Sequence, residues 1–85
     1  MDIIATILSI TKEGTVKTQI MYKANLSFKQ LNKYVNFISR RKLISAHESS
    51  HGVLYKTTVK GHKFLQDYKK IKEVLSETLE NQFGK

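Results

Sequence analysis

The sequence predicts a mainly α fold with one small β-hairpin, and three observations indicate this. Apolar residues recur at helical spacing over residues 2–42 and again over residues 58–82, whereas residues 44–57 alternate with a period of two. The chain has 85 residues and no proline, which favours one mostly helical domain. A domain of this size has a small core, so we expect no deep enclosed cleft.

Three helices are expected in the first half of the chain. The first, over residues 2–12, has one apolar face made of Ile3, Ile4, Ile7 and Leu8, and it is stopped by Gly14. A second helix is expected over residues 16–24, with Thr15 as its N-cap. The third begins at Ser27, because Gln30 follows three residues later and completes a capping box.

The second half of the chain predicts a hairpin and one long helix. Residues 44–48 and 53–57 alternate with β-branched and aromatic side chains, and residues 49–52 (Ser-Ser-His-Gly) are typical of a turn. Thr58 is expected to cap the last helix. This order of elements is that of an α+β winged helix-turn-helix. We assign residues 1–58 to a winged helix-turn-helix domain, a fold typical of DNA-binding proteins, and residues 59–85 to a C-terminal dimerisation helix continuous with it.

The last helix carries an apolar seam that favours self-association. A heptad pattern, weakening toward the end, runs through Phe64, Tyr68, Ile71, Leu75, Thr78 and Gln82, with Leu65 and Leu79 at its flanks. The small body cannot cover all of it, so we expect a homodimer whose interface includes Phe64, Tyr68, Ile71, Leu75, Thr78, Leu79 and Gln82. An antiparallel pair would hold two basic heads apart on the scale of a DNA turn or more. The alternative is a helix that packs back on its own domain.

The distribution of charge favours a polyanionic partner. The formal net charge is +8, and all of it lies within residues 1–63. No acidic residue occurs from Thr15 through Ala46, and the third helix carries a narrow stripe formed by Lys29, Lys33, Asn36 and Arg40. A solvated helix face normally mixes both signs of charge, so this stripe indicates binding of nucleic acid. The simpler alternative is a merely soluble basic protein.

In a helix-turn-helix the second helix of the pair lies in the DNA major groove, and residues 27–41 fit that position. Base edges could be contacted by Gln30, Asn32 and Asn36, and phosphates or guanine by Lys29, Lys33 and Arg40. The capped N-terminus at Ser27 favours phosphate, and the hairpin adds His51 and Lys56. We therefore expect double-stranded DNA as the partner. RNA binding stays open, although no aromatic stacking platform is evident.

The stretch HESSH, residues 47–51, matches the H-E-x-x-H pattern of zinc peptidases. That motif works on a helix, where one turn places both histidines on the same face, but residues 45–52 alternate as a strand does. The extended motif also fails, because Leu54 and Thr57 stand where a glycine and a third histidine are required. We therefore expect that the protein is not an enzyme and that it binds no metal, cofactor or small-molecule ligand.

Cysteine is absent, which excludes disulfides and thiol chemistry and leaves an intracellular setting as the default. No apolar run approaches the ~20 residues that span a bilayer, and the opening MDIIATILSI lacks the features of a signal peptide. We expect a cytoplasmic, nucleoid-associated protein without a membrane partner.

Several segments resemble the small archaeal winged-helix DNA-binding proteins, of chromatin-associated or regulatory character, that dimerise through a C-terminal antiparallel coiled coil. The matching segments lie within residues 3–68: IIATIL, KTQIMYKANLS at 17–27, Tyr34, KLI at 42–44 and YKTTVKGHKFL at 55–65. The resemblance implies a homodimer that binds double-stranded DNA with modest sequence preference. It also implies that Lys17 and Ser27 lie on the DNA side together with the stripe of the third helix.

Two roles remain open for such a protein, a local transcriptional regulator and a chromatin-type architectural protein. A different hypothesis is a protein-interaction module, in which the winged helix is a scaffold and the last helix recruits a different partner.

Overall fold

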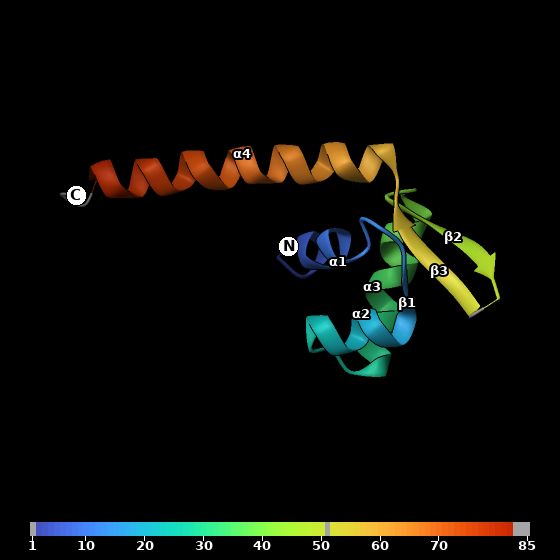
Figure 1. The fold of residues 1–85 in the computed structure, drawn as a ribbon. Coiled ribbons are helices and arrows are strands. Elements are labelled where there is room, and N and C mark those ends of the chain that lie inside the picture. The colour runs from blue at the N-terminus through green and yellow to red at the C-terminus, as the bar shows by residue number, and fades with distance from the viewer. Residues whose placement is uncertain (1, 51, 83–85) are drawn as a thin grey trace.

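The computed structural model describes the backbone of residues 2–50 and 52–82 and the side chains of residues 3–50 and 52–76. Its elements follow the order α1 (Asp2–Ile10), β1 (Thr15–Val16), α2 (Lys17–Ala24), α3 (Phe28–Arg40), β2 (Ile44–Ser49), β3 (Gly52–Thr57) and α4 (Val59–Gln82). Helices α1 to α3 form the body, the β2–β3 hairpin leaves it on one side, and α4 extends toward the other (Figure 1). The winged helix-turn-helix fold predicted from the sequence is confirmed.

One apolar core joins the helices of the body to the start of α4. Its fully buried side chains come from three different helices and comprise Ile7, Leu8, Ile20, Leu31 and Ile38. Leu43 and Ile44, at the start of the hairpin, are also buried in this core, and Leu65 adds a buried side chain from α4. The apolar face expected for the first helix is therefore confirmed, although Ile3 and Ile4 are only partly buried.

Two buried threonines connect the end of α1 to the end of β3. The hydroxyl oxygens of Thr11 and Thr57 lie 2.8 Å apart, and the Thr57 hydroxyl donates to the Leu8 carbonyl at 2.6 Å. The backbone N–H of Thr57 also donates to the Thr11 carbonyl, at 2.9 Å. Because buried polar groups need partners, this closed set of hydrogen bonds fixes the base of the hairpin against the body.

The sheet has three strands rather than the two of the expected hairpin. β3 is central, with β2 on one side and the two-residue β1 on the other, where Thr15 pairs with Tyr55 and Val16 with Leu54. The expectation that Thr15 caps the second helix is therefore wrong. Its hydroxyl donates to the Ile10 carbonyl at 3.2 Å instead, and α2 begins at Lys17 without a side-chain cap. β-branched residues suit an extended backbone, which explains the difference.

The other helix ends follow local signals in the sequence. The capping box is confirmed, since the Gln30 N–H donates to the Ser27 hydroxyl at 3.1 Å and the Ser27 N–H donates to the Gln30 side chain at 3.0 Å. α1 ends at Ile10, two residues before the expected end, and Gly14 has a φ of +95° in the turn that follows. Both wing strands reach one residue further than expected, because β2 ends at Ser49 and β3 begins at Gly52.

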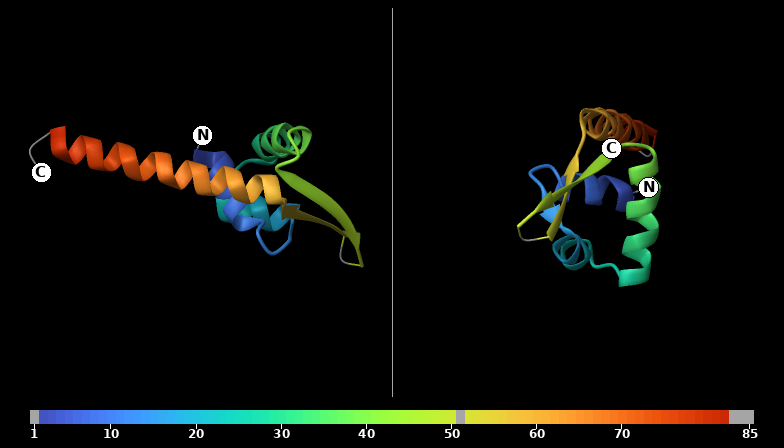
Figure 2. Two further views of the ribbon diagram at one scale, coloured as in Figure 1. Left: turned by 90° about the horizontal axis from the view of Figure 1, so that it is seen from above. Right: turned by 90° about the vertical axis from the view of Figure 1, so that its right-hand side faces the viewer.

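α4 is attached to the body through its first turns. The Thr58 hydroxyl accepts from the Gly61 N–H at 3.0 Å, which confirms Thr58 as the cap, and donates to the Lys42 carbonyl at 2.7 Å. α4 then runs past α1, as both views in Figure 2 show. Phe64 and Tyr68 are partly buried against the core, whereas every side chain from residue 69 to residue 76 is exposed. No described helix is long and apolar enough to cross a membrane.

Candidate nucleic-acid interface

α3 has two opposite faces. Leu31, Val35 and Ile38 are buried in the core. At 100° per residue, the stripe lies opposite them within an arc of about 60°. All four of its side chains are exposed: Lys29, Lys33, Asn36 and Arg40. Together they form a solvent-facing surface with three positive charges and one amide, and no acidic residue occurs in α3.

The remaining candidates on α3 differ in how free they are to meet a ligand. The Gln30 side chain is exposed, but its carbonyl oxygen already accepts the Ser27 N–H in the capping box. Only its NH₂ group is left for a base edge. Asn32 is half-buried, and Ser27 is exposed with its hydroxyl accepting from Gln30. Asn36 is therefore the polar α3 side chain best placed to recognise a base.

The turn between α2 and α3 brings Lys17 close to the start of α3. Asn25 ends α2 in the left-handed conformation, with a φ of 56°, and the chain then reverses into Ser27. As a result the Lys17 ammonium lies 5.8 Å from the centre of the Phe28 ring. The first residue of α2 and the first residue of α3 thus form one cationic and aromatic corner.

The hairpin contributes less to the expected DNA-binding surface than α3 does. Lys56 is exposed, but its register partner is Ser45, so it lies toward the base of the hairpin rather than at its tip. His47 is exposed in β2, where its Nε2 lies 2.8 Å from the Ser45 hydroxyl. His51 lies outside the described residues.

Strand β2 also shows whether the HESSH stretch, residues 47–51, can act as a zinc-peptidase motif. His47 and Glu48 lie in the extended strand β2, not on a helix, as the sequence alternation predicts. The zinc motif needs its two histidines one turn apart on the same face of a helix, and an extended strand does not provide that arrangement. Among the side chains that the structure describes, those of residues 3–50 and 52–76, no group of three or more histidines, aspartates or glutamates could hold a metal ion.

Two residues at the end of α3 were missed by the sequence reasoning. The Arg41 guanidinium stacks 3.7 Å from the centre of the Phe37 ring, and its Nη1 donates to the Phe37 carbonyl at 3.3 Å. This places a further positive charge beside the stripe. The signal that could have found it is the i, i+4 spacing of an aromatic and an arginine on a helix.

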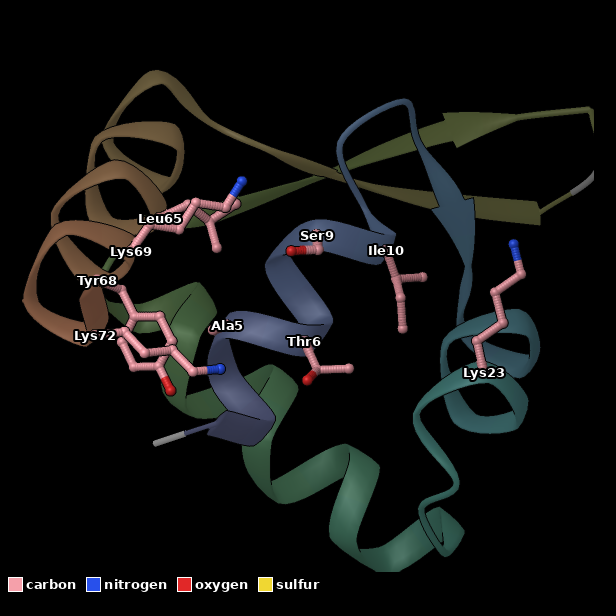
Figure 3. A pocket seen from close by; sticks show the side chains of 9 residues that line it. All are labelled: Ala5, Thr6, Ser9, Ile10, Lys23, Leu65, Tyr68, Lys69 and Lys72. Carbon is pink, nitrogen blue, oxygen red and sulfur yellow. The ribbon is translucent and has the colours of Figure 1, made fainter. Parts of the chain in front are cut away.

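A hollow lies on a different side of the body, between α1, α2 and α4 (Figure 3). It measures about 530 Å³ and is open, with Lys69 and Lys72 on the α4 side and Lys23 on the α2 side. Ser9 and Thr6 contribute hydroxyls, but the lining includes no histidine and no acid. These side chains do not form an acid–base or nucleophile–base arrangement.

α4 presents an exposed apolar surface beyond the body. Ile71, Val74 and Leu75 are 59%, 59% and 57% exposed. Val74 was not assigned to the interface from the heptad pattern, but on a 3.6-residue helix it lies beside Ile71. Phe64 and Tyr68 partly pack on the chain's own core, and the side chains of Thr78, Leu79 and Gln82 lie outside the described part. The role of these residues in a dimer stays a prediction.

The element order, the three-stranded sheet and the exposed face of α3 define a winged helix-turn-helix protein. The chain belongs to this family, since the model of the winged helix-turn-helix family matches residues 1–76. The match also confirms the resemblance to archaeal winged-helix proteins noted in the sequence.

The proteins similar to this chain include one relative in sequence and one of known structure. The protein MJ0287 of Methanocaldococcus jannaschii is 47% identical over 38 residues, which are 44% of this chain and 39% of that protein. The chain thus matches well under half the length of this relative. The crystal structure of Sso10a-2, a DNA-binding protein from Sulfolobus solfataricus, has the same fold: the TM-score is 0.68 over 93% of this chain and 87% of that one, at 19% identity.

Proposed function

We propose that the protein binds double-stranded DNA as a homodimer, with α3 in the major groove. The observation that carries this proposal is the solvent face of α3, on which Lys29, Lys33 and Arg40 are exposed opposite the core. Membership of the winged helix-turn-helix family supports it, as does the likeness to a DNA-binding protein of the same fold. The protein would act on the nucleoid as a local regulator or as an architectural protein.

The proposed docking follows from the sizes and charges involved. The major groove of B-DNA admits one α-helix and displays the base edges there. With α3 in the groove, Lys29 and Lys33 reach guanine or phosphate, and Asn36 is suited to adenine. Lys17, at the start of α2, would contact the backbone, and Lys56 would add a contact from the hairpin. The shallow hollow between Lys17 and β3, with a volume of about 380 Å³, leaves room for the sugar-phosphate backbone of one DNA strand.

Charge supplies most of the expected affinity. Residues 15–46 contain no acid, so the body presents positive charge that DNA phosphates would neutralise, with release of condensed counterions. Binding should therefore weaken steeply with salt, by about 0.9 in log K per log salt for each phosphate contacted.

The experiment measures binding to a random-sequence duplex over a range of salt concentrations. The Lys33→Ala/Arg40→Ala variant should bind on the order of tenfold or more weakly at low salt, and its salt slope should fall by about two if both side chains contact phosphates. The matched control is Lys69→Ala/Lys70→Ala, which removes two exposed charges from the middle of α4 and none from α3. It should keep most of the affinity.

Equal losses in the two variants would indicate that net charge alone attracts DNA and that α3 is not the contact. Unchanged binding of the Lys33→Ala/Arg40→Ala variant would exclude α3 from the interface.

The homodimer is proposed from the exposed apolar side chains of α4. Ile71, Val74 and Leu75 stand next to each other on a helix that the body no longer covers. The same helix from a second copy is the simplest cover, because a two-fold axis pairs the surface with itself. A second candidate function also rests on this surface, namely a module that recruits a different protein through α4.

A further inference from the structure

Phe28 is the first residue of α3 and leaves 60% of its side chain exposed. A large apolar ring at this place gains little from the core. The capping box on either side of it fixes where it lies, because Ser27 and Gln30 are bonded to each other. The Lys17 ammonium lies 5.8 Å from the centre of its ring. The ring thus stands at the N-terminal end of α3, at the first position of that helix.

We propose that Phe28 recognises the 5-methyl group of thymine in the major groove and gives the protein a preference for A·T pairs at that position. This inference rests on the proposed function, in which α3 occupies the major groove. Residues at the N-terminus of such a helix are the ones that reach base edges.

The chemistry of the groove selects thymine as the partner of this ring. Among the four bases, only thymine presents an apolar group, its C5-methyl, on the major-groove edge, and phenylalanine is one of the side chains that contact it. Cytosine carries a hydrogen at the same carbon and an amino donor beside it, which a hydrocarbon ring cannot pair. Covering one methyl group with apolar carbon strengthens binding by about fourfold.

The other exposed aromatic side chains fit this role less well. Phe37, also on α3, lies toward the C-terminal end of that helix, and the Arg41 guanidinium stacks 3.7 Å from its ring centre, closer than Lys17 lies to Phe28. Tyr22 is 85% exposed, but it belongs to α2 and not to the helix proposed to enter the groove. Among these rings, Phe28 is therefore the one that the N-terminal end of α3 would bring to the base edges.

The test compares two duplexes that differ only in thymine methyl groups. One is an alternating A·T duplex of about three helical turns, and the other has uracil in place of every thymine. The unmodified protein should bind the thymine duplex about fourfold or more tightly. Phe28→Ala should reduce this ratio to about one, and Phe28→Leu, which keeps an apolar side chain, should restore part of it. Tyr22→Ala should leave the ratio unchanged.

Because Phe28 is mostly exposed, its variants should fold, and thermal unfolding followed by circular dichroism checks this directly. The inference is overturned if the unmodified protein does not distinguish the duplexes, or if Phe28→Ala still does.

The Lys33→Ala/Arg40→Ala variant separates this result from a failure of the proposed function. If it binds both duplexes more weakly by the same factor, while the unmodified protein shows no thymine preference, α3 docking stands and only the role of Phe28 is wrong. If it binds both duplexes as well as the unmodified protein does, the docking of α3 is wrong, and the inference is overturned with it.

Discussion

Thr11 and Thr57 show how single polar side chains position the hairpin against the helical body. They lie 46 positions apart in the chain, yet their hydroxyls are 2.8 Å apart in a buried site, and both are satisfied. The pattern of the sequence does not reveal such a pair, because each threonine by itself fits a turn or a strand. The capping box of α3, in contrast, lies within four consecutive residues and was predicted in full.

We expect the two threonines to contribute jointly to stability. Thr11→Val and Thr57→Val should each lower the free energy of unfolding by about 1 kcal/mol, because each removes hydrogen bonds in a buried site. The double variant should lose clearly less than the two losses together, since it removes both partners and leaves fewer unsatisfied groups. Urea unfolding of the four proteins measures this. Strictly additive losses would mean that the hydroxyls do not depend on each other.

At the scale of the elements, the helices were predicted well and the smallest strand was not. Helical periodicity and caps are local signals, so Ser27 and Thr58 could be identified as starting points. β1 has two residues, Thr15 and Val16, and exists because Tyr55 and Leu54 stand opposite it. No local pattern of two residues specifies that pairing.

The same limit applies to the candidate site on α3. Helical spacing gave the stripe formed by Lys29, Lys33, Asn36 and Arg40. It gave neither the exposure of Phe28 nor the stacking of Arg41 on Phe37. Both depend on how much of α3 its neighbours cover, which only the packed structure specifies.

The close approach of α4 to the body predicts an unusual effect of one substitution. Replacing a glycine inside a helix by alanine normally stabilises it by about 0.5–1 kcal/mol. At Gly61, however, an added Cβ would collide with the Leu43 carbonyl oxygen and lie 2.6 Å from Cγ2 of Thr57. We therefore expect Gly61→Ala to destabilise the protein by about 1–3 kcal/mol.

Thermal unfolding measures the effect of Gly61→Ala, and Gln66→Ala serves as the control, because Gln66 is exposed on the same helix and its loss should change stability by about 0.5 kcal/mol at most. A stabilised Gly61→Ala protein would show that α4 does not pack this closely on Leu43.

For the whole molecule, the question is what covers α4. We expect Ile71→Gln/Leu75→Gln to convert a dimer into a folded monomer, because both side chains are exposed and glutamine maintains helix propensity and charge. Sedimentation at several concentrations measures this. Affinity for a long duplex should fall by on the order of tenfold or more, since the second DNA contact is no longer intramolecular.

Glu73→Gln is the control for that experiment, because Glu73 is exposed on the same helix and its replacement should preserve the dimer. A monomeric unmodified protein at high concentration would favour a different partner for α4.

The hydrogen bonds of Thr58 have a mechanical consequence. Its hydroxyl bonds the carbonyl of Lys42 at 2.7 Å, and its N–H bonds the carbonyl of Leu43 at 3.0 Å. These two residues lie two and three positions after the end of α3, so α4 is joined to the end of that helix as a rigid lever arm. If two copies pair through α4, a small change in the crossing angle of the paired helices would swing the two α3 helices through a large arc. The spacing that the molecule accepts along DNA would then depend on an angle set far from the DNA itself.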